Sequence, residues 1–465
     1  MIEFLETFNE KGAEVLEEIG GYVWGPFLLI LLVGTGLFLS IRLLFLQFRA
    51  LPYALKLSFS KHQDKESEGD ITHYQALTTA LAATVGTGNI AGVATAVVAG
   101  GPGAVFWMWI TALVGMATKY AEALLAVKYR VKNDKGEMSG GPMYYLERGI
   151  NNKAGKVLGV MFAIFAAIAA FGIGNMVQSN TAAASLEETF SIHPFITGIV
   201  FAVLAALVIL GGIKSIGKVT AFFVPIMAAF YVIGGLIVIV TNFNLVGDAV
   251  GLIFSDAFSG NAVAGGLLGT AIRYGVARGV FSNEAGLGSA PIAAAAAKTD
   301  YPARQALVSM TQVFIDTIVI CSITGITIVM ANQWGDGLDG STLTSASFAQ
   351  FLGSAGNYIV TFGVLFFTFS TILGWAYYGE KSIDYLLGDQ GVKIYRYFYI
   401  FFIFVGASVS LDVVFGFADI MNGLMAFPNL IGLLALSGVV VAETKKFMKV
   451  AKEEKLQSAG SSLDA

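Results

Sequence analysis

The chain has 465 residues, of which 56% are hydrophobic and 13% are charged, and its formal net charge is −4. Its mean hydropathy of +0.72 lies far above that of soluble domains, which excludes a soluble enzyme, and no nucleic acid is expected as a partner. The composition predicts an all-α polytopic membrane protein that lies in a lipid bilayer.

Eleven apolar runs are candidates for membrane-spanning helices, because spanning roughly 30 Å of hydrocarbon takes about 20 apolar residues. We expect spans at about 24–48, 75–100, 103–128, 157–185, 195–211, 218–241, 262–297, 303–331, 358–387, 394–412 and 415–443. The first run follows a Glu-rich segment rather than a basic one. It is therefore predicted to be a retained helix and not a cleaved signal peptide.

The positive charges indicate an orientation. The loops on one side of the expected spans carry 24 of the 28 Lys and Arg residues, whereas the opposite side has Lys11 alone. Because cytoplasmic loops are rich in Lys and Arg, we expect an outside N-terminus and a cytoplasmic C-terminus in the cell membrane.

The spans after the first one divide into two halves. We expect a first repeat at 74–241 and a second at 262–443, with an N-terminal part at 1–73 and a cytoplasmic tail at 444–465. Each half has five spans, an odd number, so the second begins on the opposite side of the membrane. This is an inverted-repeat topology, typical of transporters.

The opening span of the first half is interrupted by TVGTGNIAGV at 84–93. Its glycines are spaced one residue too widely for a dinucleotide-binding loop, and no strand precedes them. A helix broken at mid-membrane offers N–H groups to an anion and carbonyls to a cation. We therefore expect the substrate carboxylate near Thr84, Thr87, Gly88 and Asn89, and a cation near 82–85. A packing seam of small residues explains the glycines but not the Thr and Asn residues.

The second half has its own interruption at residues 273–291, RYGVARGVFSNEAGLGSAP. We expect its first half-helix to end near Ile272 to Gly275, where free carbonyls would suit an ammonium group. The two breaks together predict a site for a zwitterion.

Four long stretches are distinctive: GGPGAVFWMWITALVG at 100–115, SGGPMYYLERG at 139–149, RGVFSNEAGLGSAP at 278–291 and FSTILGWAYYGEK at 369–381. They closely resemble the sodium:alanine (alanine/glycine:cation) symporter family, and the resemblance covers essentially the whole chain. It implies a leucine-transporter-like fold, a five-plus-five inverted repeat with one extra N-terminal helix, and coupled import of alanine or glycine.

The resemblance also implies a sodium site between the first broken helix and the eighth core helix. Matched onto this sequence, its ligands are the carbonyls of Ala82, Val85 and Phe367 and the hydroxyls of Ser370 and Thr371. Oxygen ligands without a carboxylate suit a monovalent cation rather than a divalent one.

Aromatic residues are candidates for the pocket walls. Trp375 lies four residues after Thr371, on the same helical face, and is expected to limit the size of the side chain that binds. Phe171 is expected to close the other side, with Ile272 as a further apolar wall. An interfacial anchor for Trp375 and ordinary packing for Phe171 are the alternatives.

Several ionisable residues fall at or near membrane depth, where a charge costs roughly 2.5–3.5 kcal/mol on insertion scales. They are Arg273, Arg278, Glu284, Asp316, Lys119, Glu122 and Asp419. We expect structural ion pairs among them, with a gate formed by Arg278 and Glu284 on the cytoplasmic side of the second break as the alternative.

His62, His73 and His193 are all placed in loops, and the first break has no carboxylate, which favours sodium over proton coupling. Asp316 leaves proton coupling open. The predicted function is sodium-coupled import of small neutral amino acids by a monomer. A cation channel would need a continuous polar lining, and an enzyme would need a catalytic constellation that the sequence lacks.

Overall fold

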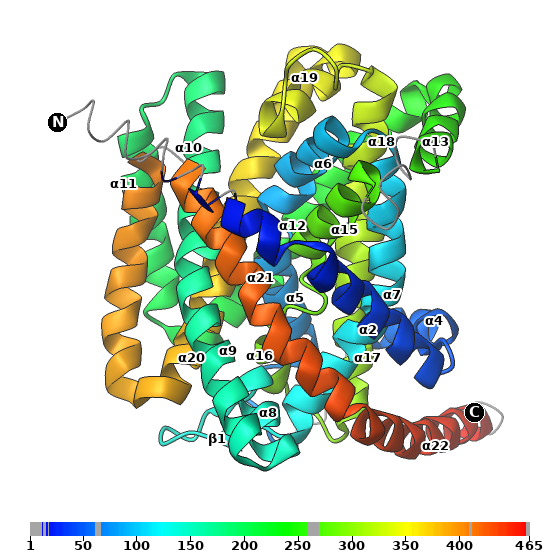
Figure 1. Ribbon diagram of the computed structural model, residues 1–465, viewed down its shortest axis with the longest axis vertical. Helices are drawn as coiled ribbons and strands as arrows, with labels where there is room; N and C mark the ends of the chain where they lie inside the picture. The colour runs from blue at the N-terminus through cyan, green and yellow to red at the C-terminus, as the bar shows by residue number, and fades with distance from the viewer. Residues whose placement is uncertain are drawn as a thin grey trace.

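The computed structural model of the chain describes residues 12, 15–16, 18–60, 67–258, 269–408 and 412–461. It is a bundle of helices, most of which run along the long axis of the molecule (Figure 1). The helices α13 and α19 lie at one end of the bundle, here called the α19 end, and α8, β1 and α22 lie at the other, the α8 end.

The elements of the first half and the N-terminal part follow one another in chain order. They are α2 (Pro26–Arg42), α3 (Leu46–Arg49), α4 (Leu51–Ser58), α5 (His73–Thr84), η1 (Gly88–Gly92), α6 (Val93–Gly100), α7 (Gly103–Lys128), β1 (Val131–Lys132), β2 (Met138–Ser139), α8 (Pro142–Ile150), α9 (Lys153–Phe171), η2 (Gly172–Met176), α10 (Val177–Phe190), α11 (Pro194–Ile209) and α12 (Gly212–Thr241).

The remaining elements begin with a helix between the two halves. They are α13 (Phe243–Ala257), α15 (Thr270–Asn283), α16 (Pro291–Ala295), α17 (Pro302–Val313), η4 (Phe314–Cys321), α18 (Ser322–Ala331), α19 (Gly340–Leu352), α20 (Ser354–Ser408), α21 (Asp412–Ala435) and α22 (Ser437–Ser461). The elements η1, η2 and η4 are π-helical, a wider winding that is frequent at functional sites.

Six helices in the described part of the chain are long and apolar enough to cross a membrane, and a bent pair makes a seventh candidate. One of the six, α20, is two helices joined at Gly388, which has a φ of 67°. The chain is thus a multi-pass membrane protein. The expected N-terminal residues at 1–11 and His62 lie outside the described residues.

The bent pair is the predicted first break. The helix α5 ends at Thr84, and η1 and α6 continue at an angle of 56° to it. Val85 is extended there, with a ψ of 90°, and therefore cannot continue the helix. His73 is not in a loop as expected, because a capping box built by Thr72 and Gln75 starts the helix there, and its ring is buried against Gln305.

The second break lies later than the sequence predicts. The prediction that a half-helix ends near Ile272 to Gly275 is wrong, since α15 is continuous to Asn283. Glu284 then adopts a left-handed conformation with a φ of 57°, and Gly286 and Gly288 also have positive φ values. Such a conformation is costly for a residue with a side chain, and it ends the helix.

Two helices occupy stretches where the sequence predicts connections. They are α13 and α19, and both are too short or too polar to count as spans. The helix α19 is tied to the first break, because Thr344 Oγ1 donates to the carbonyl of Ile90 at 3.0 Å and Thr95 Oγ1 donates to Asp339 Oδ1 at 3.0 Å.

At the α8 end, a short parallel bridge joins the chain before α5 to the chain after α16. The N–H of Asp70 donates to the carbonyl of Ala296 at 2.8 Å, and the N–H of Lys298 donates to the carbonyl of Ile71 at 2.8 Å. Burial raises the pKa of the Asp70 carboxyl, while its hydrogen bond from the N–H of Met138 acts in the opposite direction.

Arg130, just after α7, holds the same two segments. Its guanidinium donates to the carbonyls of Ala295 at 3.0 Å, Ala297 at 2.6 Å and Glu68 at 2.7 Å. One side chain thus binds the carbonyls at the end of α16 and the segment that leads into α5.

We expect Arg130→Ala to lower the melting temperature of the purified protein by about 2–5 °C, because each carbonyl that loses a charged donor costs about 1–3 kcal/mol where it stays buried. Thermal unfolding in detergent measures this. Arg130→Lys keeps the charge but loses the planar guanidinium group, so its melting temperature should lie between those of the wild type and Arg130→Ala. An unchanged melting temperature for Arg130→Ala would show that water replaces the guanidinium without loss.

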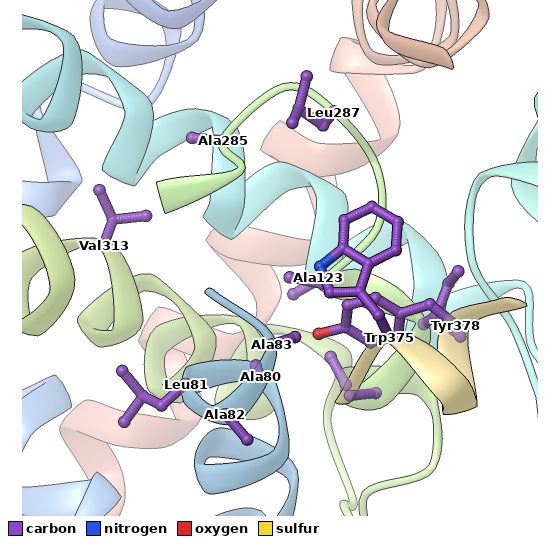
Figure 2. Packing of buried hydrophobic residues seen from close by; sticks show 14 of the residues in the cluster. Ala80, Leu81, Ala82, Ala83, Ala123, Ala285, Leu287, Val313, Trp375 and Tyr378 are labelled. Atoms are coloured by element: carbon purple, nitrogen blue, oxygen red, sulfur yellow. The ribbon is translucent and has the colours of Figure 1, made fainter. Parts of the chain in front are cut away.

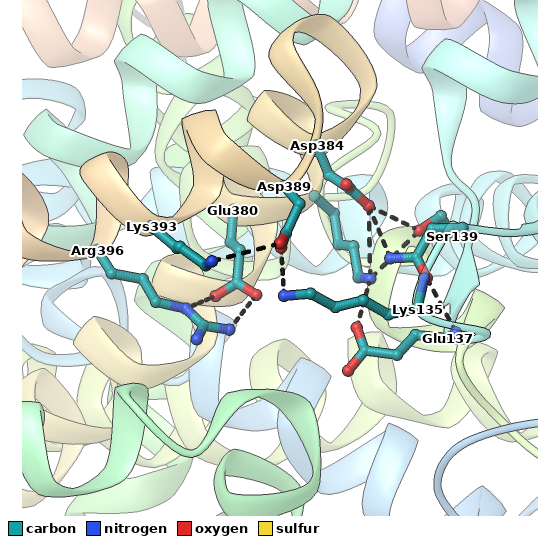
Figure 3. Close-up of polar contacts among 10 residues, drawn as sticks. Lys135, Glu137, Ser139, Glu380, Asp384, Asp389, Lys393 and Arg396 are labelled. Atoms are coloured by element: carbon teal, nitrogen blue, oxygen red, sulfur yellow. Dashed lines mark hydrogen bonds and ion pairs between the residues drawn. The ribbon is translucent and has the colours of Figure 1, made fainter.

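The hairpin of β1 and β2 is anchored on α20 by charged contacts (Figure 3). Lys135 pairs with Asp389, and the buried Lys381 contacts Glu137 at 3.3 Å and Ser139 at 3.2 Å. These contacts connect the chain after α7 to the joint within α20.

The core between α5 and α20 is packed through very small residues. A Cβ atom added at Gly374 would lie 2.6 Å from the Cβ of Ala83, so the two helices can approach this closely because glycine and alanine face each other. Figure 2 shows Ala80 and Ala83 of α5 in the same buried cluster as Trp375 and Tyr378 of α20. This close packing places the first break directly against the middle of α20.

Candidate functional site

A small cavity lies where the two breaks, η2, α10 and α20 meet. Its lining residues are Ala83, Thr84, Gly86, Thr87, Gly88, Ile173, Gln178, Phe281, Glu284, Thr371 and Trp375. Its volume of about 10 Å³ is room for roughly one water molecule. The structure therefore brings the predicted residues Thr84, Thr87, Gly88 and Trp375 together around one small cavity.

Beside this cavity, which Thr371 also lines, the predicted cation ligands form a compact cluster of oxygens. The Ser370 hydroxyl lies 3.2 Å from the carbonyl of Ala82 and 2.9 Å from that of Phe367. The Thr371 hydroxyl lies 3.3 Å from the carbonyl of Val85 and 2.9 Å from that of Phe367. The end of α5 and its C-cap point the carbonyls of Ala82 and Val85 at α20, because a helix end leaves its final carbonyls without partners within the helix.

The N–H groups of the first break are less free than predicted. The N–H of Thr87 donates to Gln178 Oε1 at 3.3 Å, and the N–H of Asn89 donates to the carbonyl of Gly86 at 3.2 Å. An unpaired N–H is costly inside a membrane, so the protein itself supplies acceptors for the N–H groups of Thr87 and Asn89. Gln178 also donates to the Thr87 hydroxyl at 3.2 Å and to the carbonyl of Ile173 at 2.8 Å.

Asn89 points away from the cavity. Its Oδ1 accepts the N–H of Gly86 at 2.9 Å, and its Nδ2 donates to Asp316 Oδ1 at 2.8 Å. Asp316 in turn accepts the hydroxyls of Ser282 and Thr317, each at 2.8 Å. Asn89 and Asp316 thus brace the first break against the end of α15.

Trp375 is fixed from two sides. Its indole N–H donates to Glu284 Oε1 at 2.8 Å, and Gly174 lies so close behind its Cβ that a side chain there would overlap it. The left-handed backbone of Glu284 aims this carboxylate into the cavity, where Ser289 Oγ also donates to it at 2.5 Å.

The loop of the second break is held by buried charges on α7. Lys119 donates to the carbonyl of Glu284 at 3.0 Å and lies 3.9 Å from Glu122. Glu122 Oε1 accepts the N–H groups of Gly286 and Gly288, each at 3.1 Å, and Asn429 donates to it at 2.6 Å. Lys119 and Glu122 form the structural ion pair that the sequence favours.

Phe171 does not line the cavity. It lies at the end of α9, and its ring packs against Tyr395 at a centroid distance of 4.9 Å and against Phe402 at 5.3 Å. The residue that reaches the cavity from this part of the chain is Ile173, because the π-helical turn at Gly172 rotates the helix face after Phe171.

Ile272 and Gly275 also lie outside the cavity lining. Both belong to the first turns of the continuous α15, and a Cβ on Gly275 would lie 2.5 Å from the carbonyl of Ala104 on α7. Gly275 thus serves helix packing. Phe281 and Glu284, about two to three turns later, take the places that these two residues were predicted to fill.

An ion pair lies near the cavity on the α19 side. Arg278 contacts Asp419 of α21 at 3.8 Å, and its guanidinium lies 5.5 Å from the ring centroid of Phe281. Since α15 runs on to Asn283, Arg278 precedes the break. The expected placement of Arg278 on the other side of the break, together with Glu284, is therefore wrong.

The lining residues that were not predicted as substrate contacts include Ile173, Gln178 and Phe281. Gln178 could have been predicted from the sequence, since a glutamine amide within an apolar span needs a hydrogen-bond partner. Ile173 and Phe281 could not, because a single apolar side chain in a membrane helix does not reveal which neighbour it faces.

The chain is similar to known proteins over nearly its whole length. The model of the sodium:alanine symporter family matches residues 9–460. The sodium/alanine symporter AgcS of Methanococcus maripaludis is 59% identical over 445 residues, 95% of this chain and 98% of that protein. An uncharacterized transporter of Haemophilus influenzae is 52% identical over 442 residues, 94% of this chain and 96% of that protein.

One solved structure shares the fold. The crystal structure of MhsT in complex with L-phenylalanine matches with a TM-score of 0.57 at 12% identity, over 81% of this chain and 98% of that one. This likeness confirms the predicted leucine-transporter-like architecture.

Proposed function

The chain belongs to the sodium:alanine symporter family, and from this premise we infer that it imports alanine, glycine or another small neutral amino acid together with sodium by alternating access. Its family consists of symporters and not of enzymes. The observation that carries the inference is the small cavity of about 10 Å³ between the two breaks, beside the oxygen cluster. A channel would need a continuous path instead.

Sodium is the ion that the oxygen cluster suits. Among the described residues that build it, none supplies a carboxylate, so the site offers neutral oxygens from Ala82, Val85, Phe367, Ser370 and Thr371. Hard monovalent cations bind to such oxygens, whereas divalent ions normally need acidic ligands. In the absence of the ion the two hydroxyls donate to the carbonyls, which keeps the cluster satisfied.

The amino acid is oriented by its two charged ends. Its carboxylate replaces Gln178 Oε1 as the acceptor of the Thr87 N–H, beside the bare backbone of Gly86 and Gly88. Its ammonium group pairs with the carboxylate of Glu284, which enters the cavity from the second break. This role for Glu284 takes the place of the carbonyls at 272–275 that the sequence suggested.

We assign eleven spans to α2, the α5–α6 pair, α7, α9–α10, α11, α12, the α15–α16 pair, α17–α18, the two halves of α20, and α21. The repeats at 74–241 and 262–443 then have opposite orientation, with 1–73 and 444–465 outside them. The excess of Lys and Arg at the α8 end supports a cytoplasmic location for that end. We propose that a single chain in the cell membrane is the functional unit.

The experiment that tests this function is uptake of labelled alanine by proteoliposomes that hold the purified protein, driven by a sodium gradient. We expect accumulation with sodium and none with potassium in its place. Accumulation driven by an inward proton gradient without sodium would contradict the sodium assignment. No accumulation under either gradient would contradict the substrate assignment.

Trp375 sets the upper size of the side chain. We expect Trp375→Ala to increase the ratio of leucine uptake to alanine uptake by about 10-fold or more, because removal of an indole deletes a wall of the cavity. Competition with unlabelled amino acids measures this ratio. Trp107→Ala is the control, since its indole donates to the carbonyl of Ala257 outside the cavity. An unchanged ratio would remove Trp375 from the pocket.

A further inference from the structure

The buried charges around the second break are not balanced in the described residues. Lys119 and Glu122 on α7 are 1% and 0% exposed and lie 3.9 Å apart, so they balance each other. Glu122 also has three neutral donors. Glu284 is 1% exposed, and no Lys, Arg or His nitrogen in the described part of the chain lies within 4.0 Å of its carboxylate.

In the described part of the chain, the groups that donate hydrogen bonds to the Glu284 carboxylate are neutral. Trp375 donates from α20 and Ser289 from the loop, while Lys119 binds the backbone carbonyl of Glu284 rather than its carboxylate. Tyr378 lies behind Trp375, at a ring centroid distance of 5.6 Å. A carboxylate in this position needs a mobile cation, because a bare charge inside the membrane is costly.

When an amino acid is bound, its ammonium group supplies that cation. After the amino acid leaves, the carrier must return without substrate to its outward-facing state before it can import the next one. The cavity has room for about one water molecule but not for a hydrated ion. The smallest cation that neutralises Glu284 in this space is a proton. We propose that Glu284 carries one proton outward on the empty carrier for each amino acid that is imported.

This proposal rests on the proposed function, and its steps balance in charge. On the outside, the arriving ammonium group replaces the proton, which leaves Glu284 for external water. On the inside, the ammonium group departs with the amino acid, and the carboxylate takes a proton from cytoplasmic water. Each cycle then moves one amino acid and one sodium ion inward and one proton outward, so that no net charge is moved.

Asp316 is the other buried carboxylate near the breaks, and its geometry does not suit this exchange. It accepts donors from Asn89, Ser282 and Thr317 and does not line the cavity, so an arriving ammonium group does not reach it. Its protonation state therefore does not follow the loading of the carrier.

Sodium-driven alanine uptake into proteoliposomes that contain a trapped pH-sensitive dye tests the proposal. We expect the lumen to become more alkaline, with about one proton lost for each labelled alanine gained. A potassium and valinomycin potential should change the uptake rate less than about 2-fold. Alanine exchange at equal concentrations on both sides is the internal control, because the loaded carrier moves both ways and no pH change should follow.

The outcomes separate the two claims. Uptake without a pH change, or with acidification of the lumen, overturns proton export and leaves the symporter assignment intact. Absence of uptake contradicts the proposed function itself. Asp316→Asn should keep the ratio of protons to alanine, whatever its rate. If it loses the proton and keeps uptake, the proton belongs to Asp316 and the role of Glu284 is wrong. If this variant does not fold, the ratio of protons exported to alanine imported by the wild-type protein decides whether a proton is exported.

Discussion

Replacement of Gly88 by leucine will reduce alanine uptake by about 100-fold or more, to the background of empty vesicles. A Cβ atom at Gly88 would already lie 3.0 Å from the Cα of Ser282 and 3.3 Å from the ring of Phe281. The rest of a leucine side chain has to enter a cavity of about 10 Å³ or force α15 away from the break. Overpacking of this kind costs about 1–3 kcal/mol, and the substrate loses its space as well.

Gly92→Ala is the matched control for this variant. Gly92 closes the same π-helical turn, but a Cβ atom there would lie 3.8 Å from the carbonyl oxygen of Thr87, which is ordinary contact. The Gly92→Ala variant should transport alanine at close to the wild-type rate. Binding of labelled alanine to both variants in detergent, measured together with their melting temperatures, distinguishes a blocked binding site from a misfolded protein. Normal uptake by Gly88→Leu would place the substrate elsewhere.

Thr371→Ala will raise the sodium concentration for half-maximal uptake by about 10- to 100-fold. The variant removes one of the clustered oxygens and leaves the carbonyl of Val85 without its hydroxyl donor at 3.3 Å. A hydrogen bond or ligand to a charged group is worth about 1.5–3 kcal/mol, which corresponds to this range. Alanine uptake as a function of sodium concentration, at saturating alanine, measures the shift.

Two further substitutions are controls for the Thr371→Ala titration. Thr371→Ser keeps the hydroxyl and should shift the sodium titration by less than about 3-fold. Thr368→Ala lies on the same helix, but its hydroxyl donates to the carbonyls of Val364 and Leu365 and not to the cluster, so its titration should match the wild type. A Thr371→Ala titration equal to that of Thr368→Ala would remove Thr371 from the sodium site.

The sequence predicted the structure best where the local conformation depends on residues that are adjacent in the sequence. The first break follows from its own glycines and threonines, and the structure bends the helix by 56° at that stretch. The family resemblance, matched residue by residue, gave the oxygens that come together between α5 and α20. Their role as sodium ligands is still a prediction.

The second break shows where such reasoning fails. The segment after Ile272 contains Gly275 and Gly279, which suggested an early end of the helix. In the structure these glycines instead let α15 pack against α7, near Ala104 and Met108. The actual break depends on Glu122, which binds the N–H groups of Gly286 and Gly288 from another helix. A contact across more than a hundred residues leaves no local pattern in the sequence.

At the α8 end, the parallel bridge between Ile71 and Ala297 connects the start of α5 to the end of α16, and Arg130 binds both segments. The other end of α5 leads through Thr84 into the first break, and the loop that leads into α16 begins at Glu284; Thr84, Thr87 and Glu284 all line the cavity. If α5 and α16 move as one piece, the distance between the groups proposed for the carboxylate and the ammonium stays constant while the path to water changes. The site then selects amino acids by the distance between their carboxylate and ammonium groups. An amino acid with one extra carbon between these two groups should bind poorly from both faces of the membrane.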